Sequence, residues 1–432
     1  MLSTTFHSSS PFYLRGILRF LSEFDWWLIA ATIFLVLISL TTLQNAGQGG
    51  VYADKQLAYV WGGLVAALVF WRIPYYFWLN RWVVISLYVV NLGLLLLVMF
   101  IGHAALGAQR WISIGPVTLQ PSEIAKMVVI FSLAAFMRTR PIRSFFDIIK
   151  VAFIMAPPAF LVFKQPDLGT SLTFGAVFLG MTFWAGASLT DVLVLLSPVI
   201  SLILNALNQQ WWLWYIGALS LWLLLFWRRK QWPLLLHLAM VVVVALGNYG
   251  CGVARPHMWG MLKEYQQKRL TSFVNPYSDP QGSGYHILQS LIAIGSGGIN
   301  GTGLGKGNQT QGAFIPERHT DFIFAVVGEE LGFKITLAII VAYTLICYRA
   351  LVIAYQAREE PGGSLTAIGL MCMFLFHVFL NIGMTMGIMP VAGVPLPFLS
   401  YGGTALIVNL SAVGILHSIR CLNPAPKQDV WQ

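Results

Sequence analysis

Apolar runs of roughly 20 residues recur along this chain from Trp26 to Leu416. A helix needs about 20 apolar residues to cross the hydrocarbon core of a bilayer. Lipid admits only helices and closed barrels, because every backbone polar group must be satisfied internally. The runs lack the alternation that is typical of membrane-barrel strands. They predict an all-α polytopic membrane protein and exclude a soluble globular fold.

The runs predict twelve spans, near 26–44, 56–71, 82–101, 123–137, 148–164, 168–187, 190–207, 211–227, 233–252, 333–348, 365–387 and 402–419. Lys and Arg gather in cytoplasmic loops. With the N-terminus inside, the inside segments carry fourteen of them and the short outside loops only three. The net charge of +10 therefore reflects membrane orientation, and no nucleic-acid partner is expected.

This sidedness divides the chain into five parts. They are a cytoplasmic segment 1–25, transmembrane helices over 26–252, a large extracytoplasmic loop 253–332, transmembrane helices over 333–419 and a cytoplasmic tail 420–432. The four cysteines are scattered and show no metal-ligand spacing, so no dedicated metal site is expected.

The external loop concentrates ionisable residues in a chain of which only 10% is charged. Its carboxylates include Asp279, Glu317, Asp321, Glu329 and Glu330. Ionisable groups beside a bilayer are costly and usually mark a pathway or a reaction site. The chemistry is therefore expected in this loop.

The same loop also carries many basic residues, among them Lys306 and Arg318. They indicate an anionic ligand such as a membrane-borne phosphate, and snorkelling onto lipid headgroups is about equally consistent with any one of them. The apolar stretch Ile287–Ile294 is too short to span and predicts an interfacial or re-entrant helix. The glycines after it permit tight turns and close approach to a ligand.

Asp321 stands at the outer start of the apolar stretch 322–327. Desolvation at a membrane interface can raise a carboxylate pKa towards the range that a general base needs. Thr320 and Asp321 also suit a helix N-cap, and the residues alone favour the cap. Arg318 could clamp a diphosphate or pair with Glu317, and His319 could orient a base, bind a sugar or serve as a scaffold residue.

Several candidates lie outside this loop. Glu123 and Lys126 share one helical face, as a structural ion pair or as the lining of a cavity for a lipid headgroup. Asp167 could cap the helix from Leu168 or line the same cavity, and Arg110 could meet Asp167 or a diphosphate. Ser400, in a Pro- and Gly-rich break between two spans, could bind a sugar or satisfy the broken backbone.

Five motifs in order resemble the SEDS family of peptidoglycan glycosyltransferases (shape, elongation, division and sporulation proteins). They are GAQRWISIGPVTLQPSEIAK (107–126), QPDLGTS (165–171), NPYSDPQGSGYHILQS (275–290), PERHTDFIFAVVGEELG (316–332) and PVAGVPLPFLSYGG (390–403). The resemblance covers almost the whole chain. The last motif and the residues before it are more similar to the RodA-like elongation branch than to the division branch.

The resemblance implies inverting polymerisation of lipid II into glycan strands at the bacterial inner membrane, with undecaprenyl diphosphate leaving. It makes Asp321, in the HTDF motif, the favoured general base. The implied partners are lipid II, the nascent strand, a class B penicillin-binding protein, elongation-complex proteins and membrane lipids. A divalent cation, Mg or Mn, shared with the substrate diphosphate is also expected, since diphosphate departure is commonly metal-assisted.

Two departures from the family pattern stand out. Ala313 replaces a glutamate that the family usually carries, and the chain is about fifty residues longer near 211–252, which predicts an inserted two-helix hairpin on a ten-helix core. Two other functions stay open: a lipid II flippase that uses the same cavity without a base, and a non-catalytic scaffold of the elongation machinery.

Overall fold

The computed structural model of the chain describes residues 24–45, 50–101, 103–105, 108–114, 117–227, 233–262, 264–278, 284–315 and 317–423. Asp279, the basic turn 228–230, the N-terminal segment up to residue 23 and the tail from residue 424 lie outside these residues. Predictions about them stay predictions.

Long helices dominate the described part of the chain, as the apolar runs predict. They are α2 (Trp26–Asn45), α3 (Val51–Arg72), α5 (Arg81–Ile101), α6 (Pro121–Met137), α7 (Phe145–Lys164), α8 (Leu168–Trp184), α9 (Leu189–Leu207), α10 (Gln209–Phe226), α11 (Leu234–Met261), α15 (Ile323–Gln356), α16 (Pro361–Thr385) and α17 (Gly403–Leu422). Shorter helices are α4 (Tyr75–Trp78), α12 (Glu264–Val274), α13 (Tyr285–Gly297), α14 (Asn308–Gln311) and the 3₁₀ turn η2 (Pro276–Ser278).

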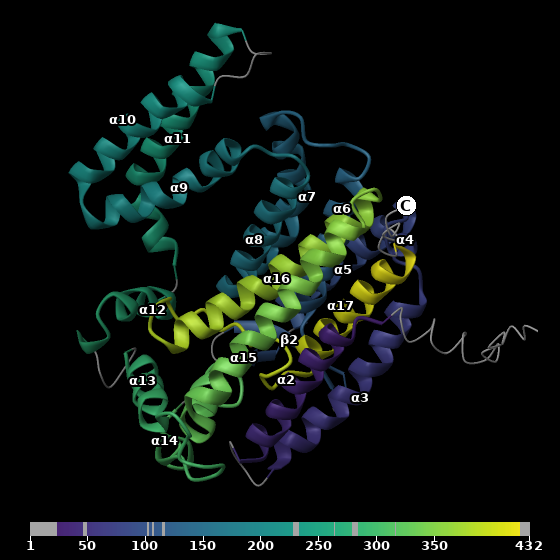
Figure 1. Ribbon diagram of the computed structural model, residues 1–432. Helices are drawn as coiled ribbons and strands as arrows, with labels where there is room; N and C mark the ends of the chain where they lie inside the picture. Colours follow the sequence, from purple (N-terminus) through teal and green to yellow (C-terminus); the bar gives the residue numbers. More distant parts are fainter. Residues whose placement is uncertain are drawn as a thin grey trace, which may run out of the picture.

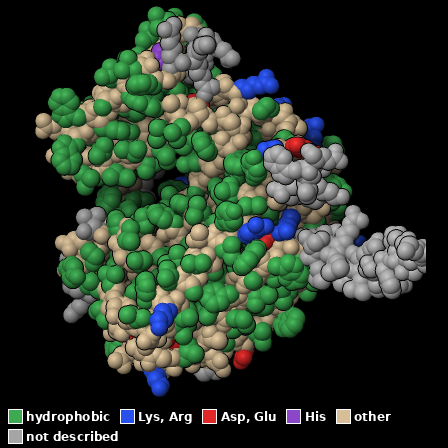
Figure 2. Space-filling view, viewed as in Figure 1, with side chains coloured by type: hydrophobic (Ala, Val, Ile, Leu, Met, Phe, Trp, Pro, Cys, Tyr) green, Lys and Arg blue, Asp and Glu red, His purple; other side chains and the backbone are tan. Residues whose placement is uncertain are grey.

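Eight of the described helices are long and apolar enough to cross a membrane: α2, α5, α7, α9, α11, α15, α16 and α17. Figure 2 shows apolar side chains over most of the visible face, as expected of a surface that meets lipid. The predicted all-α polytopic membrane fold is therefore confirmed, and the twelve predicted spans each correspond to one of the twelve long helices.

The centre of the bundle is formed by α6, α15, α16 and α17, with α3 packed along α17 and α8 along α16. In Figure 1, α15 and α16 run antiparallel through the middle of the molecule, and α13 and α14 lie at one end of it. The ends of the helices at α13 and α14 are called the outer end here, and the opposite ends the inner end. The outer end holds the candidate site.

One break in α15 corrects the predicted loop boundary. The helix begins at Ile323, whereas the sequence predicts a start at 333, and it is interrupted at Gly332, where φ is +73°. A Cβ at Gly332 would lie 2.2 Å from the backbone nitrogen of Gly301, so only glycine fits this close approach. The segment 323–331 is therefore an extra helical stretch that packs against α13.

A small antiparallel sheet was not predicted. Strands β1 (His103–Ala105), β2 (Ala108–Ile114) and β3 (Val117–Leu119) are ordered β1-β2-β3 at the outer end, between α5 and α6. Arg110 and Trp111 lie on β2, so the sheet fixes where both side chains stand.

Helices α9, α10 and α11 pack chiefly against one another, and Figure 1 shows α10 and α11 set to one side of the bundle. Polar bonds hold this unit together: the Trp212 indole donates to Ser201 (2.7 Å), the Asn248 amide to Ser197 (2.9 Å) and the Trp227 indole to Asp191 (3.0 Å). The sequence predicts α10 and α11 as an inserted hairpin, and none of their residues lines the outer-end site.

Candidate active site at the outer end of the bundle

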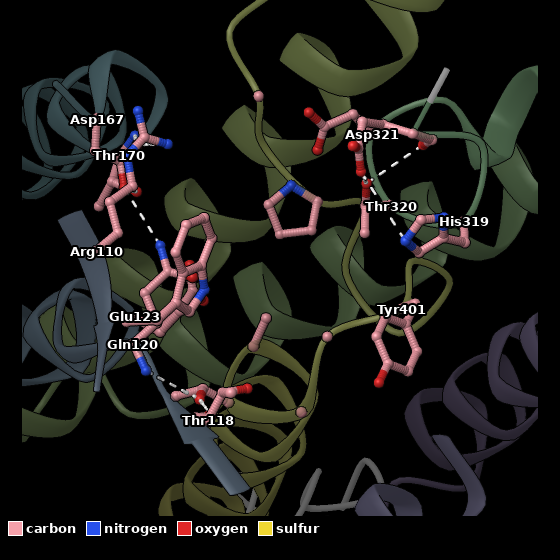
Figure 3. Close-up of a pocket in the computed structure, with 18 of the residues that line it drawn as sticks. Arg110, Thr118, Gln120, Glu123, Asp167, Thr170, His319, Thr320, Asp321 and Tyr401 are labelled. Carbon is pink, nitrogen blue, oxygen red and sulfur yellow. Dashed lines mark hydrogen bonds and ion pairs between the residues drawn. The ribbon is translucent and has the colours of Figure 1, made fainter. Parts of the chain in front are cut away.

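A cavity of about 320 Å³, bordered by many polar and charged residues, opens among the outer ends of the central helices. Figure 3 shows two walls facing each other, one with Arg110, Glu123 and Asp167, the other with His319 and Asp321. The complete lining is Tyr59, Arg110, Trp111, Thr118, Gln120, Glu123, Asp167, Thr170, Arg269, Glu317, His319, Thr320, Asp321, Gly393, Pro395, Tyr401, Gly402, Gly403, Thr404 and Ala405. Segments far apart in the sequence thus share one cavity.

Asp321 lies in this lining and does not cap α15. The N-cap residue of that helix is Phe322, without a side-chain capping bond. The cap interpretation of Asp321 is therefore wrong, and its carboxylate is left for the cavity. Desolvation raises the pKa of Asp321 to about 6, against the opposing effect of the Arg269 guanidinium.

The backbone that carries Asp321 is held at three consecutive carbonyls. The Tyr401 amide donates to His319 O (2.9 Å), the Ser400 hydroxyl to Thr320 O (2.7 Å) and the Asn381 amide to Asp321 O (2.9 Å). Movement of this segment would break all three hydrogen bonds, each worth about 1 kcal/mol. Helix α16 and the loop between α16 and α17 therefore fix the position of Asp321 together.

Arg269, on α12, is a site residue that the sequence did not single out. A Cβ at Gly393 would lie 3.5 Å from an Arg269 guanidinium nitrogen and 3.5 Å from Asp321 Oδ2, so these two groups are at most about 7 Å apart. The basic stretch of the external loop was the only sequence signal for it. Asn381 was missed too, because a lone asparagine in an apolar span gives no sign of its partners.

The opposite wall is organised around Asp167. Its carboxylate caps α8 by accepting from the Thr170 amide (3.2 Å), accepts from Ser122 (3.3 Å) and lies 3.9 Å from the Arg110 guanidinium. Arg110 also donates to the Pro166 carbonyl. Both predicted alternatives for Asp167, the cap and the cavity carboxylate, therefore hold at once.

Glu123 and Lys126 form a buried ion pair of 2.8 Å between α6 residues, as predicted. Glu123 lines the cavity, while Lys126 lies behind it and contacts the His377 ring of α16 at 3.3 Å. The ion pair thus joins the cavity wall to the helix that holds Asp321 in place.

His319 and Tyr401 form an aromatic edge of the cavity. The His319 ring stacks on Tyr52 of α3 at 4.3 Å and lies 3.9 Å from the Glu317 carboxylate. Burial lowers the pKa of His319, against the opposing effect of the Glu317 carboxylate, and so favours the neutral ring. Flat aromatic faces beside hydroxyl groups can receive a sugar ring.

Three predicted substrate-binding residues point elsewhere. Arg318 donates to the Thr310 carbonyl and Lys306 is exposed in the glycine-rich turn, so neither belongs to the cavity lining. Ser400 is buried, accepts from the Leu396 amide (2.8 Å) and satisfies the loop backbone. The sequence spacing of Arg318 and Asp321 does not predict that their side chains point in different directions from one tight turn.

Two other carboxylates of the predicted segment also face away from the cavity. Glu329 accepts from the Gln309 and Thr310 amides at 2.8 and 2.9 Å and so holds the start of α14. Glu330 is buried beside it and does not line the cavity. Of the predicted acidic cluster, Glu317 and Asp321 therefore remain at the site among the described residues.

The fold and the site define a polytopic helical membrane protein with a polar, carboxylate-bearing cavity at one end of its bundle. The model of the family described as "Cell cycle protein", which comprises FtsW, RodA and SpoVE, matches residues 20–215 and 213–423. The chain belongs to this family. The two matches meet within α10, so the status of 211–252 as an insertion stays a prediction.

Curated relatives agree with this assignment. The chain is 37% identical to the peptidoglycan glycosyltransferase MrdB of Escherichia coli K12, over 91% of this chain and 92% of the relative. It is 33% identical to the peptidoglycan glycosyltransferase RodA of Treponema pallidum, over 93% of this chain and 98% of the relative.

Solved structures share the fold. A chain from a peptidoglycan synthase complex that coordinates polymerization and crosslinking aligns with a TM-score of 0.67 and 26% identity, covering 93% of this chain and 99% of that one. RodA of Thermus thermophilus aligns with a TM-score of 0.59 and 24% identity over 92% of this chain and 97% of that one, which shows the fold alone.

Proposed function

We propose that Asp321 is the general base of glycan polymerisation by this chain. The chain is a peptidoglycan glycosyltransferase of the elongation type, as its family membership and its 37% identity to MrdB indicate. In the proposed step the Asp321 carboxylate takes the proton from the acceptor sugar hydroxyl. The hydroxyl oxygen forms a bond to the anomeric carbon of lipid II, and the bond from that carbon to the undecaprenyl diphosphate breaks with inversion.

One observation carries this proposal: Asp321 is a cavity carboxylate without a capping role, and its pKa is raised to about 6. A base works best when its pKa lies near the operating pH. The three held carbonyls at 319–321 support the same role, because catalysis depends on accurate positioning of the reacting groups.

Guanidinium groups in the cavity suit the leaving diphosphate. Arg269 stands beside Asp321, and Arg110 stands on the opposite wall. Guanidinium groups bind phosphate oxygens in a bidentate manner. These two arginines therefore replace Arg318 and Lys306 as the proposed diphosphate ligands.

A divalent cation, Mg or Mn, is proposed as a shared ligand of the diphosphate. The cavity offers the oxygen donors of Glu317, Glu123 and Asp167, which suit such hard cations. Within the described residues, no group of three or more His, Cys, Asp or Glu side chains is arranged to hold a metal by itself. When bound, the cation would neutralise charge on the departing diphosphate.

We further propose that the outer end faces away from the cytoplasm, at the bacterial inner membrane, with both termini cytoplasmic. The Lys and Arg bias of the short loops supports this orientation. A class B penicillin-binding protein is the proposed crosslinking partner, supported by the likeness to a chain from a synthase complex that couples polymerization and crosslinking. Other elongation-complex proteins are proposed as further partners.

Labelled lipid II tests the proposal. The purified chain with its transpeptidase partner is expected to yield glycan polymer, and Asp321→Asn is expected to yield none. Asp147→Asn, which changes an inner-end carboxylate paired with Lys150, is the matched control and should behave as wild type. Polymer from Asp321→Asn would refute the base. Lipid translocation in vesicles without polymer would favour the flippase, and assembly of the complex with neither activity would favour the scaffold.

A further inference from the structure

A second cavity, of about 550 Å³, lies at the inner end of the bundle. It is formed where α6, α8 and α15 end and where α16 begins. Its lining is Met137, Arg138, Pro141, Trp184, Ala185, Tyr355, Arg358, Pro361, Ser364 and Leu365. It shares no residue with the cavity of Asp321.

The separation of the two cavities can be estimated along helix α16, because this helix contacts Asp321 near one end and lines the second cavity near the other. Its Asn381 contacts the backbone of Asp321, and its Ser364 lines the second cavity. At 1.5 Å per residue the 17 residues between them span about 26 Å, close to the roughly 30 Å of a bilayer's hydrocarbon core. The second cavity therefore lies near the membrane interface opposite Asp321.

Arginines give this cavity its charge. Arg138 and Arg358 are exposed, and neither forms an ion pair with a carboxylate among the described residues. Glu359 and Glu360 follow Arg358 in the chain but do not line the cavity. Guanidinium groups are well suited to recognise phosphate.

Aromatic residues shape the rest of the cavity. The Arg358 guanidinium donates to the Tyr355 hydroxyl (2.8 Å) and lies over the Tyr355 ring at 4.9 Å. The Trp184 indole donates to the Ser364 hydroxyl at 2.8 Å, which fixes that wall. Trp184 and Tyr355 also supply the exposed apolar surface of the lining, and the buried Met137 and Leu365 close the cavity from behind. Tryptophan and tyrosine are typical of the headgroup level of a membrane.

We propose that this second cavity binds the phosphate of an anionic phospholipid in the leaflet opposite Asp321. Arg138 and Arg358 take the phosphate oxygens, and the acyl chain follows the apolar wall. The alternative, snorkelling of two unrelated arginines, requires neither a cavity nor the fixed positions of Trp184 and Arg358. The proposal does not depend on the role of Asp321.

Native mass spectrometry of the full chain, titrated with phosphatidylglycerol in detergent, tests the proposal. Arg138→Gln/Arg358→Gln is compared with Arg72→Gln/Arg81→Gln, which changes two exposed arginines that do not line the cavity. We expect the first pair to weaken tight phosphatidylglycerol binding by about tenfold or more, since charge-assisted bonds are lost, and the second pair to leave it unchanged. Arg138→Lys/Arg358→Lys keeps the charge without the planar fork and should lie between them.

Parallel arms identify the ligand. Phosphatidylcholine tests the need for net negative charge, and inorganic phosphate tests the need for a lipid. Equal retention of phosphatidylglycerol by all variants would overturn the proposal, as would equally tight binding of phosphatidylcholine. Protection of the wild-type chain from thermal unfolding by inorganic phosphate alone, equal to that by phosphatidylglycerol, would also overturn it and assign a free anion. The lysine pair keeps the test valid if the glutamine pair does not fold.

Discussion

The Asn381 side-chain amide donates one hydrogen bond to the Asp321 carbonyl at 2.9 Å and another to the Val394 carbonyl at 2.7 Å. Asn381 is fully buried in α16, so it joins the segment of the proposed base to the loop between α16 and α17. The Ser400 hydroxyl makes a second link between these segments, because it donates to the Thr320 carbonyl at 2.7 Å and accepts from the Leu396 amide at 2.8 Å. The residue that positions Asp321 is thus itself fixed by the centre of the bundle.

Removal of this amide should lower the rate more than the affinity. Asn381→Ala leaves the buried Val394 carbonyl without its donor, at about 1–3 kcal/mol, and also removes the donor of the part-buried Asp321 carbonyl, so that Asp321 can shift. A misplacement of about 1 Å can cost roughly a hundredfold in rate. We expect kcat of lipid II polymerisation to fall ten- to a hundredfold with KM little changed.

A second buried asparagine provides the control that distinguishes loss of positioning from general loss of stability. Asn409→Ala, on α17 and away from the cavity lining, should lower the thermal midpoint without lowering kcat of the folded fraction. Equal kcat losses in the two variants, at equal folded fractions, would contradict the positioning role.

The pH dependence of polymerisation should report Asp321. Because desolvation raises its pKa to about 6, the basic form is populated above that pH and lost as the pH falls through it. We expect the rate to rise about tenfold per pH unit below 6 and to level off above it. Single-turnover rates with labelled lipid II between pH 5 and 8 measure this profile.

Substitution of Arg269 should shift this pH profile in a known direction. Its guanidinium lowers the pKa of Asp321 against the larger effect of desolvation, so Arg269→Gln should move the profile to higher pH. Arg255→Gln, on α11 with its side chain bonded to the Asn205 carbonyl, is the control and should leave the profile in place. A shift to lower pH in Arg269→Gln would show that another group controls the rate.

At the inner end, Asp25 should be a major source of stability. Its fully buried carboxylate accepts from Arg349 of α15 at 2.6–3.0 Å and pairs with Arg420 of α17, which ties three helices together. Removal of one partner from a buried ion pair costs about 3–5 kcal/mol. We expect Asp25→Asn to lower the thermal midpoint clearly, while Asp54→Asn, an exposed position on α3, should not. Equal thermal midpoints of Asp25→Asn and Asp54→Asn would contradict a stabilising role of the Asp25 ion pairs.

Much of this architecture follows from the sequence. The apolar runs predict each long helix because membrane spans are set by length and hydrophobicity, which are local properties. The pairs Glu123–Lys126 and Arg110–Asp167 were foreseen because charges in an apolar bundle need partners. The concentration of ionisable residues around Asp321, in a chain with few charged residues, predicts the location of the site.

Other features depend on three-dimensional packing and were not foreseen. Arg269 reaches Asp321 from a helix more than fifty residues earlier, and no local pattern predicts such an approach. The direction of Arg318 depends on a tight turn in which Glu317 has φ +48°. The sheet around Arg110 and the early start of α15 were hidden because short strands and glycine breaks give weak signals.

Substitutions in the Glu123–Lys126 ion pair should affect stability and activity differently. Lys126→Met leaves an unpaired buried carboxylate and should destabilise the chain by about 3–5 kcal/mol, whereas Glu123→Gln/Lys126→Met removes both charges and should recover most of that loss. If Glu123 serves the cavity, the double variant stays inactive although it is stable. Thermal midpoints and polymerisation rates of the wild type, Lys126→Met, Glu123→Gln and the double variant form the cycle. Recovery of activity together with stability would make the pair purely structural, since Glu123 would then not be needed at the cavity wall.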